Sequence, residues 1–214
     1  TIENAHPHVS QGKVTVVHNG IIENHQLLRQ QLQTTYEFET DTDTEVLVHL
    51  LDREISAAGD LTLGVSNALR QLKGAFAITV MHVDYPRKLL AARVGSPLVV
   101  GIGIGENFVA SDVQALRPVT NRFLFLEEGE IVELTSTDIS IKGLNRAAID
   151  SRTIELEDVQ DTAISKGHFR HFMLKEIYDQ PDALRQTLEG RLTSDSVLVP
   201  SFGVNAESIF QKVK

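Results

Sequence analysis

A β-branched run near the start of the chain gives the first clear element. Lys13–His18 has the sequence KVTVVH, which predicts a strand. We expect this strand to break at Asn19-Gly20, because that pair is typical of tight turns. Four positions then recur at helical spacing: Ile21, His25, Leu28 and Leu32. The pattern predicts that the chain passes from the strand into an amphipathic helix that begins near Ile21.

Two further helices are predicted from their N-terminal signals. Thr42-Asp43-Thr44-Glu45 has the form T-x-x-E, in which Thr42 caps the helix and Glu45 reaches back to it. Asp60 is expected to cap the next helix, and Gly74 is expected to end it. Apolar residues follow both caps at helical spacing, so each helix has one face suited to a core.

From Gly74 onward the pattern changes to short β-rich segments separated by Gly, Pro and Asp. The predicted strands are Phe76–His82, Lys88–Val94, Pro97–Ile102, Phe108–Ser111, Arg122–Leu126 and Glu130–Thr135. Successive strands after a block of helices favour antiparallel sheets covered by helices over alternating βαβ units. The predicted fold class is therefore a layered α+β domain.

The periodicity weakens after about Asn145. Asp150–Lys166 is polar and acidic, which favours a linker or an extended arm. One more helix is predicted over Met173–Leu188, either bent or begun afresh near Pro181. A short helix is predicted within Val204–Lys214.

Composition narrows the classes of function. The chain has 214 residues and a formal net charge of −9, which argues against nucleic acid as a partner, since phosphate binding needs clustered Lys and Arg. No apolar run approaches the roughly 20 residues of a membrane span. The start of the chain has no signal-peptide character, so we expect a cytoplasmic protein with no membrane partner. The absence of cysteine excludes disulfides, Cys-based zinc sites and a cysteine nucleophile within these residues.

Two positions carry candidate chemistry. Asn19-Gly20 ends the predicted strand with a side-chain amide and an open backbone N–H, and two such donors can form an oxyanion hole. An ordinary turn is the alternative at this pair. Asp43 lies at a predicted helix start, where the helix macrodipole is a sufficient structural reason for a carboxylate. The functional alternative is that Asp43 binds an ammonium group.

The histidines and glycines do not predict a metal or nucleotide site. The histidines crowd two regions: His6, His8, His18 and His25 in one, and His168 and His171 in the other. Metal binding needs three or four convergent ligands at defined spacing, which these patterns lack. Gly101–Gly105 does not match G-x-G-x-x-G and leads into a strand, so we expect a hairpin there. The sequence therefore indicates no metal and no cofactor.

Several segments together resemble a known enzyme class. They are Asn4–His8 (NAHPH), Val16–Asn24 (VVHNGIIEN), Glu39–Val46 (ETDTDTEV), Leu90–Leu98 (LAARVGSPL) and Gly105–Asp112 (GENFVASD). On these segments the chain resembles the glutamine amidotransferases with an N-terminal nucleophile. Phe172–Pro181 (FMLKEIYDQP) resembles, more narrowly, the place where the glutaminase domain of glucosamine-6-phosphate synthases meets the sugar-isomerase domain. The resemblance covers almost the whole chain in unbroken order.

The resemblance implies a fold and a set of partners. The fold is a four-layer αββα sandwich of antiparallel sheets, like that of N-terminal-nucleophile hydrolases, incomplete at its N-terminus. Residues 1–150 would form the glutaminase domain, and residues 151–214 the linker and the start of the isomerase domain. The family releases ammonia from glutamine and passes it through an internal channel to fructose 6-phosphate, which gives glucosamine 6-phosphate. The implied partners are glutamine, fructose 6-phosphate in the isomerase domain, and further copies of the chain in a homo-oligomer.

The resemblance also implies roles for single residues. In the family an N-terminal cysteine attacks the glutamine amide, and its own α-amino group serves as the base. By position, the Asn19 amide and the Gly20 N–H would form the oxyanion hole. Asp43 would hold the α-ammonium group of glutamine, and His6 would support the pocket. Because the cysteine is absent from these residues, the resemblance implies a chain truncated at both ends and inactive alone.

Two alternatives stay open. One is another amidotransferase of the same class, such as a phosphoribosyl-pyrophosphate or asparagine-forming relative, against which Lys175–Pro181 argues. The other is a catalytically dead regulatory module that holds glutamine without hydrolysing it. The absence of cysteine would suit that second alternative.

Overall fold

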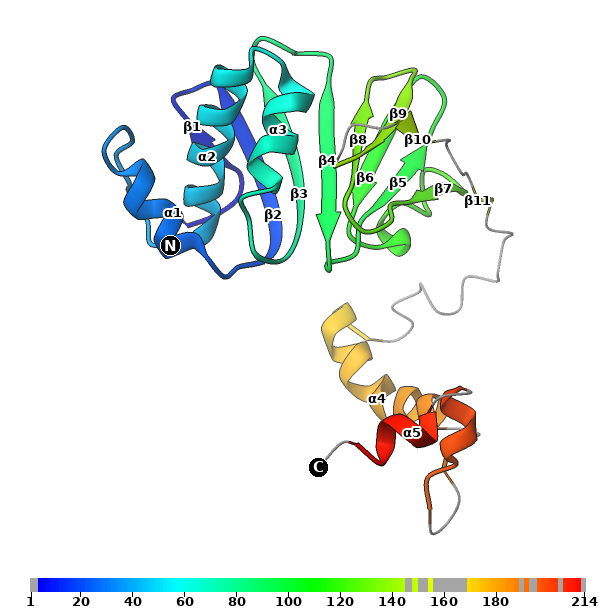
Figure 1. Cartoon of the computed structure of the whole chain (residues 1–214). Coiled ribbons are helices and arrows are strands. Elements are labelled where there is room, and N and C mark those ends of the chain that lie inside the picture. The colour runs from blue at the N-terminus through cyan, green and yellow to red at the C-terminus, as the bar shows by residue number, and fades with distance from the viewer. Residues whose placement is uncertain are drawn as a thin grey trace. The chain divides into compact units, whose positions relative to one another are not determined.

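The structure, a computed structural model, describes residues 4–144, 148–149, 154–155, 169–188, 191–192, 196–203 and 206–212. The chain divides into two compact units, Thr1–Val159 and Gln160–Lys214 (Figure 1). Each unit has its own internal packing. The roles predicted for residues 1–150 and 151–214 stay a prediction.

A seven-stranded antiparallel sheet is the centre of the first unit, in the order β1–β2–β3–β4–β8–β9–β10. Its strands are β1 (His8–Ser10), β2 (Val14–Ile22), β3 (Gly74–His82), β4 (Leu89–Val94), β8 (Glu130–Leu134), β9 (Ile139–Gly143) and β10 (Ala148–Ile149). β2 pairs with β3 over its whole length, from Val14 opposite His82 to Ile22 opposite Gly74. β1 covers only the beginning of β2, where Ser10 lies opposite Val14.

A smaller antiparallel sheet packs against one face of this sheet. Its order is β11–β7–β5–β6, with strands β5 (Val99–Ile102), β6 (Asn107–Ala110), β7 (Arg122–Phe125) and β11 (Ile154–Glu155). One core joins the two sheets and includes Ala77, Ala91, Leu98, Val100, Leu124 and Val132. This core forms because alternate residues of each strand point inward.

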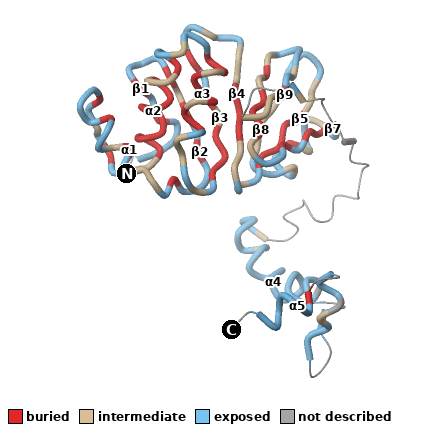
Figure 2. Tube along the Cα trace, viewed as in Figure 1, coloured by how far each residue is buried: buried red, intermediate tan, exposed pale blue. Residues whose placement is uncertain are grey.

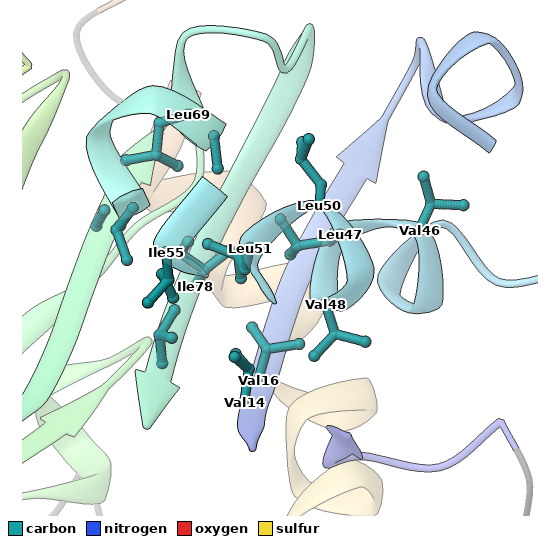
Figure 3. Close-up of a cluster of buried hydrophobic side chains, with 14 of the residues drawn as sticks. Val14, Val16, Val46, Leu47, Val48, Leu50, Leu51, Ile55, Leu69 and Ile78 are labelled. Carbon is teal, nitrogen blue, oxygen red and sulfur yellow. The ribbon is translucent and has the colours of Figure 1, made fainter. Parts of the chain in front are cut away.

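Three helices cover the other face of the large sheet: α1 (His25–Leu32), α2 (Asp43–Ala58) and α3 (Leu61–Leu69) (Figure 1). Figure 3 shows the core beneath them, which includes Leu47 and Leu51 of α2 and Val16 of β2. The residues of this core are almost completely buried, as the red segments of α2, β2 and β3 in Figure 2 show. The burial of α2 holds its first turn at a fixed place over β2.

The layers confirm the predicted sandwich of antiparallel sheets. On its outer face the smaller sheet carries a third apolar cluster formed by Val99, Leu116 and Phe123. The 3₁₀ helix η1 (Val113–Ala115) and the residues after it pack on this cluster. In the described part of the unit, η1 and the residues after it cover this outer cluster.

The prediction that the first strand breaks at Asn19-Gly20 is wrong. β2 continues to Ile22, with Asn19 opposite Ala77 and Gly20 opposite Phe76. Gly20 has a φ of +130°, and a Cβ at this position would lie 2.1 Å from the carbonyl oxygen of Ala75. The pair therefore permits a close approach of two strands and does not form a hairpin turn. As a consequence α1 begins at His25 and not near Ile21.

The predicted helix caps are present, but two details differ. Thr42 Oγ1 accepts the Glu45 N–H at 3.2 Å, and Asp60 Oδ1 accepts the Leu63 N–H at 2.7 Å. The Glu45 carboxylate does not reach back to Thr42, because it binds the N–H groups of Glu39 and Thr40 at 2.7 and 2.8 Å. The third helix ends at Leu69, and Gly74 instead opens β3 at a φ of +125°.

The strands from Phe76 to Thr135 are confirmed. All six predicted strands are present, with ends displaced by no more than two residues. The glycine-rich segment forms the predicted hairpin between β5 and β6, closed by a hydrogen bond from Gly103 N–H to the Glu106 carbonyl at 3.0 Å. The sequence did not predict β1, β9, β10 or β11. The predicted linker Asp150–Lys166 lies mostly outside the described residues.

The second unit contains α4 (Phe172–Leu188), the 3₁₀ helix η2 (Val199–Phe202) and α5 (Ala206–Phe210). α4 is a single helix that continues through Pro181, so no new helix begins there. α5 lies within the predicted C-terminal helix, and the rings of Phe202 and Phe210 meet edge-on at 5.4 Å. No helix in the described ranges is long and apolar enough to cross a lipid bilayer.

Candidate functional site

Asp43 lies beside the strand segment that contains Asn19 and Gly20. It is the first residue of α2, and its Oδ2 accepts the backbone N–H of Ile22 at 2.8 Å. Its Oδ1 lies 4.0 Å from Nδ1 of His18. His18 directly precedes Asn19, and Ile22 lies three residues after it, which is about 10 Å of strand. The fold thus brings the helix start and the Asn19-Gly20 pair together.

The edge of β2 is unpaired at this place. β1 pairs only with Val14–Val16, so in the described part of the unit no strand covers the far side of β2 from Val17 to Ile22. Asn19, Gly20 and Ile21 are all exposed. Asp43 is partly exposed, with 22% of its side chain accessible. The backbone at this edge and the Asp43 carboxylate are therefore both accessible to a ligand.

His18 connects Asp43 to the strand. Side chains alternate along β2, so His18 points toward the helices beside the buried Val16, and Asn19 points to the other face. His18 is 6% exposed, and its Nδ1 forms a 3.0 Å hydrogen bond with Thr44 Oγ1. The Thr44 hydroxyl in turn lies 3.5 Å from Asp43 Oδ1. These contacts fix the orientation of the first turn of α2 against β2.

Asn19 and His6 line one cavity of about 200 Å³ between the two sheets. The other residues around it include Val17, Thr79, Leu98, Ala110 and Ser111. Asn19 can donate its side-chain amide into this cavity, and exposed His6 lies at its border. Gly20 and Asp43 do not line it. The structure therefore groups the predicted site residues as Asn19 with His6, and Asp43 with the strand edge.

Burial lowers the pKa of two histidines near this edge. It lowers the pKa of His18, and the charges of His6 and His8 lower that pKa further, whereas Asp43 opposes the shift. Burial likewise lowers the pKa of His8, with an added contribution from His6. A lowered pKa disfavours the charged form of both imidazoles. Asp43 is consequently the group at this edge that is suited to bind a cation.

No group of three or more His, Asp or Glu side chains within the described ranges is placed to hold a metal ion. The chemistry of the site therefore depends on an amide, a backbone N–H and a carboxylate. An amide and an N–H can stabilise a negatively charged oxygen. A carboxylate can hold a positively charged nitrogen.

Sequence reasoning did not predict the parts played by His18, Thr44 and Ile22. The inward position of His18 follows from the alternation of the strand once the strand is known to continue past it. No local signal pairs the Ile22 N–H with Asp43, because these residues are distant in the sequence. Only the packing of α2 on β2 creates that contact.

Comparison with protein families gives one match. Residues 2–118 match the family profile described as a glutamine amidotransferase domain. The matched range contains His6, Asn19, Gly20 and Asp43.

The curated relatives are named glutamine–fructose-6-phosphate aminotransferase (isomerizing). The protein from Idiomarina loihiensis is 52% identical over the whole chain, and this chain covers 35% of that relative. The proteins from Pseudomonas aeruginosa and Vibrio cholerae are 48% and 49% identical over 99% of this chain, which covers 34% of each. The chain thus spans about a third of the length of the curated relatives it matches.

Among solved structures, the chain resembles glutamine phosphoribosylpyrophosphate amidotransferase from B. subtilis, with a TM-score of 0.58 and 29% identity. That match covers 69% of this chain and 33% of the solved chain. A second structure, titled the allosteric regulatory enzyme of purine biosynthesis, has a TM-score of 0.57 and 30% identity, covering 66% and 31% of the two chains. Both support the fold assigned above.

Proposed function

Because this chain belongs to the glutamine amidotransferase domain family, we propose that it is the glutamine-hydrolysing part of a glutamine–fructose-6-phosphate aminotransferase. The single observation that carries the proposal is the position of Asp43. Its carboxylate is bound at the bare edge of β2, within three residues of Asn19 and Gly20. A substrate with an ammonium group and an amide can use both ends of this arrangement.

In this proposal each residue has a separate role. Asp43 binds the α-ammonium group of glutamine, and the Asn19 side-chain amide donates to the oxygen that becomes negative when the substrate amide is attacked. Backbone N–H groups alternate in direction along a strand. The Ile22 N–H points to the free edge, so we place the Gly20 N–H, two residues earlier, at the same edge as the second donor. His6 borders the cavity next to Asn19 and supports the substrate.

The nucleophile is proposed to come from outside these residues. The chain contains no cysteine, and cysteine is the nucleophile in the family that it resembles. The chain alone is therefore expected to be inactive as a glutaminase. Glutamate release by the purified chain should not exceed that of a heat-denatured sample.

The proposal extends to the partners of the whole protein. The names of the aminotransferases described above include fructose 6-phosphate as a substrate. The chain spans about a third of their length. We propose that Phe172–Pro181 leads toward an isomerase domain that binds this sugar phosphate, in a cytoplasmic homo-oligomer. Another amidotransferase is less well supported, since identity falls from 52% over the whole chain to 29% over 69% of it.

A chimaera tests the proposal in an active context. Residues 1–214 replace the aligned third of the Idiomarina loihiensis relative, and glutaminase and aminotransferase rates are measured. Asn19→Ala should lower kcat about 10²–10³-fold with little change in the KM for glutamine, as for the loss of one oxyanion donor. Asp43→Asn should mainly raise that KM.

Asn121→Ala provides the matched control, because Asn121 is exposed and lies outside the site. A raised KM with unchanged kcat in Asn19→Ala would make Asn19 a binding residue only. Unchanged kinetics in Asp43→Asn, with a lowered melting temperature, would reduce Asp43 to a residue that stabilises the helix start.

A further inference from the structure

A hydroxyl and an imidazole lie next to Asp43 and have no role in the function proposed above. Thr44 is the second residue of α2, and His18 precedes Asn19 on β2. Both residues are buried. A buried polar group normally has a hydrogen-bond partner, because an unmade bond costs free energy. Each of these two groups contacts the other, and both lie close to the Asp43 carboxylate.

The charge of Asp43 decides which nitrogen of His18 carries the proton. Nδ1 lies 3.0 Å from Thr44 Oγ1 and 4.0 Å from Asp43 Oδ1. Burial lowers the pKa of His18, which favours the neutral ring. A proton on Nδ1 points the positive end of an N–H bond toward the carboxylate, whereas a proton on Nε2 leaves a lone pair facing it. Nε2 has no hydrogen-bond partner within the described residues, so a proton there would also be unpaired. The proton therefore belongs on Nδ1.

This tautomer directs the Thr44 hydroxyl at Asp43. The His18 Nδ1–H donates to Thr44 Oγ1, so the hydrogen of the hydroxyl points elsewhere. In the part of the chain that the structure describes, its one further partner is Asp43 Oδ1, at 3.5 Å. Because that distance is long for a hydrogen bond, the hydroxyl acts mainly as a dipole aimed at the carboxylate. Donors in series polarise one another, so the imidazole strengthens this dipole.

The Asp43 carboxylate is thereby held at both oxygens. Oδ2 accepts the Ile22 N–H of β2 at 2.8 Å, and Oδ1 faces the Thr44 hydroxyl of α2. These two contacts restrict the rotation of the carboxylate. Each oxygen has a second lone pair, and 22% of the side chain is accessible, so the carboxylate can still accept from a ligand. A group that is ordered before binding loses less freedom when it binds.

We propose that Thr44 is a positioning residue whose hydroxyl, backed by His18, holds the Asp43 carboxylate in the orientation that binds the α-ammonium group of glutamine. This inference rests on the function proposed above. Thr44 is only 4% exposed, so it acts through Asp43 and does not touch the substrate. It therefore sets the affinity for glutamine and leaves the turnover of bound glutamine unaffected.

The kinetics of Thr44 variants in the chimaera described above test this role. Thr44→Val keeps the branched shape of the side chain and removes the hydroxyl. The KM for glutamine should rise about twofold to tenfold, as for the loss of one hydrogen bond, with little change in kcat. Thr44→Ser restores the hydroxyl and should return the KM close to its original value. A residue that only stabilises the fold would not separate KM from kcat in this way.

Thr62→Val is the matched control. Thr62 is also the second residue of its helix, α3, is also buried, and donates its hydroxyl to Glu133 Oε2 at 2.9 Å. Glu133 belongs to β8, which β3 and β4 separate from β2, so this contact lies outside the glutamine site. Thr62→Val should lower the melting temperature as Thr44→Val does and leave the KM for glutamine unchanged.

A double variant tests the part played by His18. His18→Phe removes the imidazole donor and keeps an aromatic ring. If His18 acts through Thr44, the KM of the double variant with Thr44→Val should not exceed that of the more affected single variant. Independent effects, in which the two increases in KM multiply, would overturn this part of the inference.

Asp43→Asn separates a failure of this inference from a failure of the proposed function. A raised KM in Asp43→Asn together with an unchanged KM in Thr44→Val would overturn the inference alone. Unchanged kinetics in both variants would remove the ammonium-binding role of Asp43 and the inference with it. An equal rise in KM from Thr62→Val would show that Thr44 acts only through stability. Where Thr44→Val does not fold, Thr44→Ala removes the same hydroxyl with a residue that favours helices, and the same rise in KM is expected.

Discussion

Two helices of similar length have opposite surroundings in this protein. α2 spans 16 residues and α4 spans 17. Leu47, Leu50 and Leu51 of α2 are completely buried against the sheet, whereas Met173 and Leu184 of α4 are 67% and 62% exposed (Figure 2). Both helices carry apolar residues at helical spacing. An apolar helix face therefore becomes part of a core only where a sheet lies beneath it.

The contrast matters for function because α2 carries one residue of the proposed glutamine site. Its first residue, Asp43, accepts a hydrogen bond from the Ile22 N–H at the edge of β2. A helix buried in this way holds its polar side chains at fixed positions. α4 instead leaves apolar side chains such as Met173 and Leu184 exposed.

Removal of one leucine from each helix should give the largest difference in stability. Leu50→Ala in α2 should lower the free energy of unfolding by about 2–5 kcal/mol, since it leaves a cavity in the core. Leu184→Ala in α4 should change it by no more than about 0.5 kcal/mol. Urea unfolding followed by circular dichroism measures both. Equal losses would show that α4 is buried in solution.

Two glycines allow the same comparison between a position in contact with a neighbouring strand and a position with open space around it. Gly20→Ala should cost about 1–3 kcal/mol or more, because it combines an unfavourable φ with a Cβ only 2.1 Å from the Ala75 oxygen. Gly105→Ala also has a positive φ, of +73°, but no atom lies within 4 Å of the added Cβ. It should cost about 1 kcal/mol from the backbone alone. The melting temperatures of the two variants separate the steric clash at Gly20 from the backbone strain that both variants share. Equal decreases in melting temperature would contradict the close approach of β3 to Gly20.

The helix caps should give a smaller effect. Thr42→Ala removes the side chain that accepts the Glu45 N–H and should cost about 1 kcal/mol. Thr187 in α4 forms a comparable local bond, to the carbonyl of Ala183, but at an exposed position near the end of its helix. Thr187→Ala should therefore leave the urea midpoint unchanged. A loss from Thr187→Ala as large as that from Thr42→Ala would remove the distinction between the two helices.

The smallest expected effect is on how stability against urea changes as the pH is lowered. The pKa of Glu45 is lowered in the folded chain, so its contribution to stability is present above the pKa of the unfolded state. That contribution is lost as the pH falls through the folded pKa. The urea midpoint of the unmodified chain should therefore fall more steeply on acidification than that of Glu45→Gln, with Glu106→Gln as the control for a lost exposed charge. Parallel acid profiles for all three proteins would mean that the bonds from Glu39 and Thr40 do not stabilise the ionised form.

Much of the fold was predictable from local signals. The helix caps at Thr42 and Asp60 are predicted by residue type and spacing. The strands from Phe76 to Thr135 are predicted by β-branched runs separated by turn residues. The family resemblance was likewise carried by short segments such as Val16–Asn24. These features depend on neighbouring residues only, so the sequence determines them without knowledge of the fold.

Tertiary structure alone decided the remaining features. Asn19-Gly20 has the local preference of a turn, yet β3 approaches so closely that the strand continues and only glycine fits. Glu45 has the spacing of a capping box, yet the preceding segment folds over the helix start and supplies nearer donors. Asp43 meets the Ile22 N–H only because α2 packs on β2. The order of residues fixes where amide, carboxylate and imidazole groups lie along the chain. Which of these groups meet depends on the packing of distant segments, because a contact between distant residues leaves no local pattern.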